Sequence, residues 1–188
     1  MNVRAGEPHR SGLWPLAPLI VFALVSLTVG VVARNSNGVV DPSDYLQLFF
    51  TDPIHLKVWF ASAAFVLACF QVATATAIYG RLRFLPTGPA VATIHRWSGR
   101  LAILLTLPVA YHCIFLLGYG DYTTRVTVHS LLGSAIYGAF IAKVLIVRGG
   151  NRIPGWELPV AGGILFAILL GLWLTSALWF FRNVEIGL

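Results

Sequence analysis

The sequence contains few charged side chains. Only 11% of its residues are Asp, Glu, Lys or Arg, whereas soluble globular domains carry about 25%. Acidic residues are the scarcest, with seven among 188 positions, while 57% of the chain is apolar. So little charge cannot cover a water-facing surface of this size, and the composition therefore predicts an integral membrane protein.

Motifs of several common chemistries are also missing. The sequence has no Ser-His-Asp arrangement, no phosphate-binding glycine loop and no Cys-x-x-Cys pair, so hydrolase, nucleotide and thiol chemistry have no candidate residues. The two cysteines, Cys69 and Cys113, lie in different apolar stretches at different expected depths, and we predict that they do not form a disulfide.

Long apolar runs are what the sequence does contain. A helix needs about 20 apolar residues to cross a bilayer core of about 30 Å. Five stretches meet this requirement, and we predict an all-α protein whose residues 1–188 form a single transmembrane domain of five helices. The predicted helices cover residues 13–33, 54–79, 93–117, 126–147 and 157–181.

The loop between the first two predicted helices is the longest. Within it, Asp41-Pro42-Ser43-Asp44 is typical of a helix cap, and the apolar residues 45–50 follow. We therefore expect a short interfacial helix in this loop, lying along the outer membrane surface.

The basic residues are distributed unevenly between the two faces of the predicted bundle. By the positive-inside rule, the face richer in basic residues is cytoplasmic. The sequence thus predicts a multi-pass plasma-membrane protein with a cytoplasmic N-terminus and an extracytoplasmic C-terminus, and the net charge of +6 reflects this orientation rather than nucleic-acid binding. Nine of the thirteen basic residues lie on the predicted cytoplasmic face: Arg4, Arg10, Arg81, Arg83, Arg96, Arg100, Lys143, Arg148 and Arg152.

Two histidines are placed symmetrically about the turn between the third and fourth predicted helices. His112 precedes the turn and His129 follows it, and their midpoint falls between Gly120 and Asp121. In antiparallel helices that rise 1.5 Å per residue, the two imidazoles should lie at the same height. This is the arrangement of a bis-histidine b-type haem, so we expect His112 and His129 to be the iron ligands, near the extracytoplasmic side.

Two further histidines are candidate cofactor-binding residues. His55, at the outer start of the second helix, belongs to the same layer, so a pairing of His55 with His129 or with His112 stays open. His95 lies near the cytoplasmic side, about 25 Å along the third helix from His112. Interhelical or headgroup hydrogen bonds are the alternative role for all four residues.

Helices three and four each begin with a His-x-x-x-Gly pattern, and here the sequence resembles known haem proteins. The segment His95-Arg96-Trp97-Ser98-Gly99-Arg100 is similar to the His-x-x-x-Gly-Arg signature of ferric-reductase-type membrane haem proteins. Val128-His129-Ser130-Leu131-Leu132-Gly133 resembles the His-Ser-x-x-Gly motif of the cytochrome b561 family. The overall layout, including residues 108–113 before the outer turn, resembles an uncharacterised actinobacterial family of multi-helix membrane proteins. The resemblance implies a haem-ligand role for His129, and more weakly for His95 and His112.

The sequence also departs from those families. Cytochrome b561 proteins pair histidines between the second and fourth and between the third and fifth of six helices, whereas the fifth predicted helix here contains none. The ferric reductases space the two histidines of one helix more closely than 95 and 112. A second haem, a substrate and a reductase activity therefore do not follow from the resemblance.

The leading hypothesis is a membrane b-type cytochrome that holds haem b and transfers electrons, either as an oxidoreductase or as its electron-transfer subunit. Its expected partners are the lipid bilayer, an extracytoplasmic electron carrier or a quinone, and a membrane or redox subunit. The alternative is a non-redox membrane subunit, such as an assembly or transport component, in which the histidines are structural.

Overall fold

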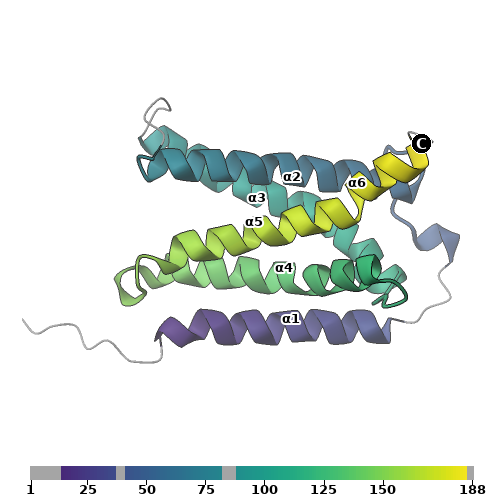
Figure 1. Ribbon diagram of the computed structural model, residues 1–188, viewed down its shortest axis with the longest axis horizontal. Helices are drawn as coiled ribbons and strands as arrows, with labels where there is room; N and C mark the ends of the chain where they lie inside the picture. The colour runs from purple at the N-terminus through teal and green to yellow at the C-terminus, as the bar shows by residue number, and fades with distance from the viewer. Residues whose placement is uncertain (1–13, 37–40, 82–87, 186–188) are drawn as a thin grey trace, which may run out of the picture.

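The computed structural model describes residues 14–36, 41–81 and 88–185, and within these ranges the chain is helical with no strand (Figure 1). Five helices are long and apolar enough to cross a membrane, which confirms the predicted fold class. They are α1 (Ala17–Asn35), α2 (Pro53–Ile78), α3 (Pro89–Tyr111), α4 (Thr124–Gly149) and α5 (Glu157–Thr175).

The long helices lie side by side and alternate in direction, so the described chain begins and finishes at opposite ends of the bundle (Figure 1). We call these the N-terminal end, where α1 begins, and the C-terminal end, where residue 185 lies. The closest packing occurs in the pairs α1–α4, α2–α3, α4–α5 and α2–α5. The pair α3–α4, whose helices carry His95 and His129, is therefore not among the closely packed pairs.

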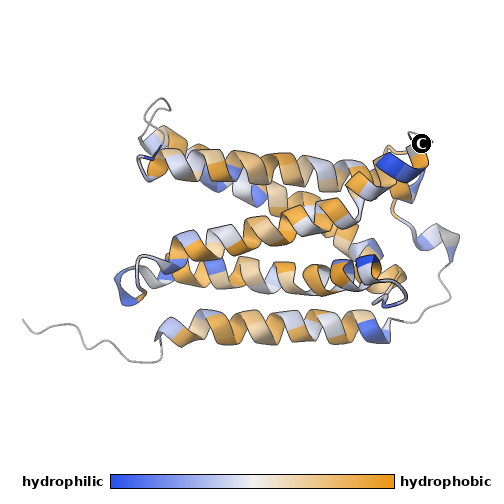
Figure 2. Ribbon diagram, in the orientation of Figure 1, coloured by the Kyte–Doolittle hydropathy of each residue, from blue (hydrophilic) through white to orange (hydrophobic). Residues whose placement is uncertain are grey.

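The core of the bundle is small and built from short apolar side chains. Ala68 of α2 and Ala139 of α4 pack with Ile136 and Leu169 in one buried cluster. Small residues at such contacts let helices approach closely, and this approach drives association inside a membrane. Apolar residues cover most of each helix and polar ones gather near the ends (Figure 2), as a lipid-facing surface requires.

Capping residues explain where the helices begin. Asp52 caps α2, because its Oδ1 accepts the backbone N–H groups of Ile54 at 2.8 Å and His55 at 2.9 Å. Thr123 caps α4 by accepting from the N–H of Val126 at 3.3 Å. The helix predicted to start at residue 93 begins earlier, at Pro89, because proline suits the first helical position.

The interfacial helix expected in the first loop is shorter than predicted. Its cap forms as expected, since Asp41 accepts from the backbone N–H of Ser43 at 2.9 Å, but the 3-10 turn η2 covers only Pro42–Asp44. Residues 45–50 are irregular and include Leu48 at a φ of 52°. One ring of this segment packs inward instead: the Tyr45 ring stacks on the His112 imidazole with centroids 5.8 Å apart.

The last predicted helix is interrupted near its end. Ser176, with φ −120° and ψ −80°, separates α5 from the short helix α6 (Ala177–Phe180), and a π-helical turn, η5 (Phe181–Glu185), follows. The Ser176 hydroxyl donates to Leu172 O at 2.6 Å. The interruption exposes the carbonyl of Thr175 to a partner outside its own helix, the Arg125 guanidinium, which donates to it at 2.6 Å.

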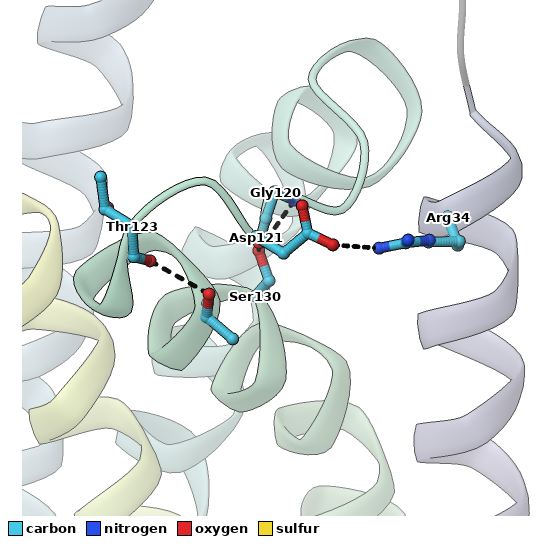
Figure 3. A network of polar contacts seen from close by, with 6 residues as sticks. Arg34, Gly120, Asp121, Thr123 and Ser130 are labelled. Carbon is cyan, nitrogen blue, oxygen red and sulfur yellow. Dashed lines mark hydrogen bonds and ion pairs between the residues drawn. The ribbon is translucent and has the colours of Figure 1, made fainter.

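The turn between α3 and α4 is bound to both neighbouring helices (Figure 3). The π-helical turn η3 (His112–Leu116) ends α3, and the chain then passes close to α1. A Cβ on Gly118, whose φ is +70°, would lie 2.7 Å from Ser36 O, so this approach needs glycine. Arg34 of α1 donates to Asp121 at 2.6 Å, and Ser130 of α4 exchanges two hydrogen bonds with the backbone of Gly120, at 3.1 and 3.0 Å.

Candidate functional site

His129 lies one turn into α4 and contacts the end of α5. Its Nδ1 is 2.9 Å from Thr175 Oγ1, and that hydroxyl lies 2.7 Å from Gly171 O. A threonine hydroxyl has one hydrogen, which the Gly171 carbonyl takes, so the oxygen accepts from His129 Nδ1–H. In the neutral imidazole, the lone pair is then on Nε2, the nitrogen that a metal or a donor group can use.

His112 is completely buried at the start of η3. Its Nδ1 donates to Pro108 O at 2.8 Å, because a carbonyl oxygen can only accept. The other nitrogen, Nε2, is buried and has no hydrogen-bond partner among the described residues. Leaving a buried polar atom unpaired costs about 1–3 kcal/mol, and a buried acceptor of this kind is a common sign of an absent ligand.

A cavity of about 80 Å³ lies among α2, α3, α4 and α5, and His129 is on its wall. Tyr137 and Thr106 bound it, and their hydroxyl oxygens lie 3.1 Å apart, linking α4 to α3. The rest of the wall is mainly apolar and rich in small residues. It consists of Ala61, Ala64, Val109, Ala110, Cys113, Ile114, Gly133, Ile136, Leu169, Leu172, Trp173 and Ser176.

Positive charge is concentrated beside His129. Arg125 and Lys57 both lie near enough to the imidazole to act on it electrostatically. The Arg125 guanidinium also lies over the Trp179 ring, 4.1 Å from its centroid, which keeps the cation at this end of the bundle. An apolar space with a histidine on its wall and two cations nearby suits an amphipathic ligand that carries negative charge.

The structure gives His112 and His129 different surroundings. His129 is on the cavity wall and contacts α5, whereas His112 contacts Pro108, Tyr45 and Tyr111. The cavity does extend along η3 to Cys113, the residue that follows His112. The two predicted ligands therefore belong to neighbouring parts of one region, and the joint binding of one group by both stays a prediction.

His55 lies at the start of α2, at the same end of the bundle. Its Nδ1 contacts a carboxylate oxygen of Asp52, and its ring packs edge-on against Phe180 with centroids 5.7 Å apart. The backbone N–H of His55, followed by its side chain, lowers the pKa of Asp52 below the ordinary value by hydrogen bonding to the charged carboxylate. The cap and the imidazole thus stabilise one another.

His95 lies toward the N-terminal end of the bundle, away from the cavity. Its Nδ1 is 2.7 Å from Thr74 Oγ1 in α2, and the Thr74 hydroxyl lies 2.9 Å from Phe70 O. By the reasoning used for Thr175, this hydroxyl accepts from Nδ1–H. Lys143 acts on His95 electrostatically across the bundle, and no histidine from another described helix contacts it.

The glycines of the two His-x-x-x-Gly patterns have different neighbours. A Cβ on Gly99 would lie 2.9 Å from Gln71 Oε1, because the Gln71 amide fills the space and donates to His95 O at 2.5 Å and Ser98 Oγ at 2.7 Å. A Cβ on Gly133 would meet only Leu172 Cδ2, at 4.0 Å, and Gly133 lines the cavity. The glycine of the pattern is thus tightly packed against a neighbouring helix near His95 and lines the cavity near His129.

Other candidate chemistry is limited in the described part of the chain. Within residues 14–36, 41–81 and 88–185, no group of three or more His, Cys, Asp or Glu side chains could hold a metal ion. Cys69 and Cys113 are both free, as predicted. The basic residues Arg4, Arg10 and Arg83, used above to predict orientation, lie outside the described residues.

The sequence analysis did not identify Thr175 or Thr74, the two threonines whose hydroxyls contact histidine Nδ1 atoms. Their signal is faint, because each is a single hydroxyl in an apolar helix and such residues commonly bond only to the carbonyl four positions earlier. Tyr45 was also missed, since its ring reaches His112 from a loop 67 residues earlier in the chain.

These features define a helical multi-pass membrane protein with a histidine on the wall of an apolar cavity. The sequence model of a family of unknown function (DUF6529) matches residues 15–188, and the chain belongs to that family. No curated protein and no solved structure matches the chain.

Proposed function

We propose that this protein is a membrane b-type cytochrome that binds one haem b near the C-terminal end of the bundle and transfers electrons there. By the positive-inside rule, that end is extracytoplasmic. His129 is the first proposed axial ligand, and the second is His112, with His55 as the alternative. The observation that carries the proposal is the buried Nε2 of His112, which has no hydrogen-bond partner in the part of the chain that the structure describes.

The donor set supports the proposal. Histidines that ligate a metal nearly always donate their other N–H to a fixed acceptor, which holds the ring and its tautomer. Both proposed ligands do this, His112 to Pro108 O and His129 to Thr175 Oγ1. A haem supplies one-electron chemistry at its iron, and the protein sets its potential through the ligands and their surroundings.

The residues that line the cavity suit a haem, because they are mainly apolar and include His129. The volume of the cavity is smaller than a haem needs. Small-molecule pockets usually measure about 300–1,000 Å³, and this cavity measures about 80 Å³. A flat macrocycle would need the helices around the cavity to separate, including α4 and α5 where Gly133 faces Leu172. The Thr106–Tyr137 contact joins α3 to α4 at the cavity wall, so binding is expected to change it. Lys57 and Arg125 are the residues suited to pair with the propionates.

The partner of this cytochrome is proposed to be an extracytoplasmic electron carrier or a quinone dissolved in the bilayer. A ligand near the extracytoplasmic face is within reach of both. A membrane or redox subunit that completes the electron path would pack against the long apolar faces of the helices.

The second candidate is a non-redox membrane subunit, and one observation favours it. Each of the four described histidines already contacts another residue through Nδ1, and three of these contacts join separate helices or a helix to its own cap. In that case the histidines stabilise the bundle, and replacement of His112 by leucine should be tolerated, because it removes an unpaired buried acceptor.

The test is a reduced-minus-oxidised absorption spectrum of detergent-purified protein from cells supplied with haem, with haem per chain measured by pyridine extraction. The proposal predicts one haem per chain in the wild type and loss of the b-type signal in His129→Ala. If neither His129→Ala nor His112→Ala loses the signal, this site is wrong. If the wild type holds no haem, the structural subunit is the better account.

A further inference from the structure

Thr175 is the last residue of α5, and it contacts two residues of α4. Its side-chain oxygen lies 2.9 Å from His129 Nδ1, and its backbone carbonyl accepts from the Arg125 guanidinium at 2.6 Å. His129 and Arg125 are four positions apart and therefore share one face of α4. One residue of α5 thus contacts two side chains one helical turn apart.

The break at Ser176 makes this double contact available. In an uninterrupted helix, the carbonyl of Thr175 would accept the backbone N–H four residues later. Here α5 ends at Thr175, and the carbonyl bonds to Arg125 instead. The hydrogen of the Thr175 hydroxyl points back toward its own helix, where it is shared between Gly171 O at 2.7 Å and Leu172 O at 3.2 Å.

We propose that Thr175 is a positioning residue that fixes the Nδ1–H tautomer and the ring orientation of His129, and that Arg125 holds Thr175 in place. This leaves the Nε2 lone pair of His129 as the group presented to a ligand. This proposal rests on the proposed function, because it explains how His129 is held ready to bind the haem iron. The tautomer itself is expected in haem-free protein as well.

The contact between Thr74 and His95 supports this assignment from a second place in the fold. There too a threonine hydroxyl directed to its own helix, 2.9 Å from Phe70 O, lies 2.7 Å from a histidine Nδ1 on a neighbouring helix. The same threonine–histidine arrangement therefore occurs at both ends of the bundle. Of these two histidines, His129 lines the cavity and His95 does not.

The first experiment measures the imidazole nitrogens by ¹⁵N NMR in haem-free protein labelled at histidine, with His129→Gln used to assign the signal. In the wild type, His129 should show a protonated Nδ1 and an unprotonated Nε2. Thr175→Val keeps the side-chain volume but removes the acceptor, so the Nδ1–H population should fall. Thr175→Ser should restore the wild-type signal.

Two control variants test whether the effect is local. Thr74→Val should change the His95 signal and leave that of His129 unchanged. Thr28→Val removes a hydroxyl that bonds only to Leu24 O, at 2.8 Å on α1, and should change neither. An unchanged His129 signal in Thr175→Val, or an equal change in Thr28→Val, overturns the assignment. If Thr175→Val does not fold, Thr175→Ala carries the same comparison.

The second experiment uses protein that has bound haem. Loss of such an N–H acceptor typically lowers metal affinity about 10-fold to 100-fold, so Thr175→Val should retain less haem and have a shifted midpoint potential, and Thr175→Ser should match the wild type. Equal retention and potential in all three proteins overturn the positioning role toward haem. A wild type without haem refutes the proposed function alone, because the NMR result still decides the tautomer.

Discussion

The two His-x-x-x-Gly patterns of this chain look alike in sequence and differ in three dimensions. At His95 the glycine makes room for Gln71, whose amide donates to His95 O and Ser98 Oγ. At His129 the glycine lines a cavity, and a Cβ there would meet Leu172 Cδ2 at the ordinary contact distance of 4.0 Å. A His-x-x-x-Gly pattern therefore leaves a helix surface without a side chain at the glycine. The residues of the facing helix decide whether that surface becomes a packing contact or the wall of a cavity.

The largest expected difference between the two patterns is in haem binding. His129→Ala should abolish the b-type absorption of protein purified from haem-supplied cells, because it removes a proposed ligand from the cavity wall. His95→Ala should retain it, because the space beside His95 is occupied by Gln71. Haem per chain from pyridine extraction gives the readout. If His129→Ala retained haem and His95→Ala lost it, the binding site would lie at His95 and not at His129.

The next difference concerns stability and uses the same substitution in both patterns. Gly133→Ala places its Cβ in ordinary van der Waals contact with Leu172 Cδ2, at 4.0 Å, and should stabilise the helix by up to about 1 kcal/mol. Gly99→Ala displaces the Gln71 amide and loses hydrogen bonds that contribute about 1 kcal/mol each, so it should destabilise the protein. Thermal unfolding in detergent measures both.

A double substitution sharpens the stability comparison. Gln71→Ala removes the amide that Gly99→Ala displaces, so the combined variant should be more stable than the sum of the two single effects predicts. Strict additivity would show that Gln71 does not occupy the space above Gly99 in the folded protein.

A smaller effect is expected from the link between α3 and α4. Tyr137→Phe removes the hydroxyl that lies 3.1 Å from Thr106 Oγ1. Interhelical hydrogen bonds in membranes contribute about 0.6 kcal/mol on average, so the stability loss should be of that size. Tyr122→Phe is the matched control, since the Tyr122 side chain is exposed. A loss of several kcal/mol would mean that this contact, and not packing, holds the cavity closed.

The smallest effect concerns the start of α2 and its dependence on pH. The pKa of Asp52 is lowered by hydrogen bonds from His55 and the backbone, so its contribution to stability is present above the ordinary pKa and is lost as the pH falls through the lowered one. Asp52→Asn keeps the cap but should flatten this dependence. The start of α3, at Gly88 with no side-chain cap, should show none. Unfolding measured between pH 2 and 6, roughly the range in which carboxylates titrate, checks both.

The five helices could be predicted from the sequence, because a run of about 20 apolar residues has few other solutions in a chain this hydrophobic. The exact ends could not. The helix α2 begins one residue before its predicted start, at Pro53 after the cap Asp52, and α3 begins four residues before its predicted start, at Pro89. The break at Ser176 has no proline or glycine to mark it.

The candidate site was predictable in part. His129 could be found because an intramembrane histidine is rare and costly. Its partner could not, because the position of Thr175 depends on how α4 and α5 pack, and a threonine in an apolar helix looks the same with or without a histidine opposite. The expectation that one loop would form an interfacial helix failed beyond residue 44 for a similar reason: the stacking of Tyr45 on His112 is a long-range contact.

The attachment of α1 to the turn at residues 118–121 has a consequence for how the protein is made. The first helix enters the membrane first, but its contacts are with α4 and with this turn, through Tyr119 N to Ala33 O at 3.0 Å and through Arg34 to Asp121. Those partners leave the ribosome more than 80 residues later. The first helix must therefore remain in lipid without its neighbours, and its apolar surface lets it do so until the last hairpin arrives to complete the bundle.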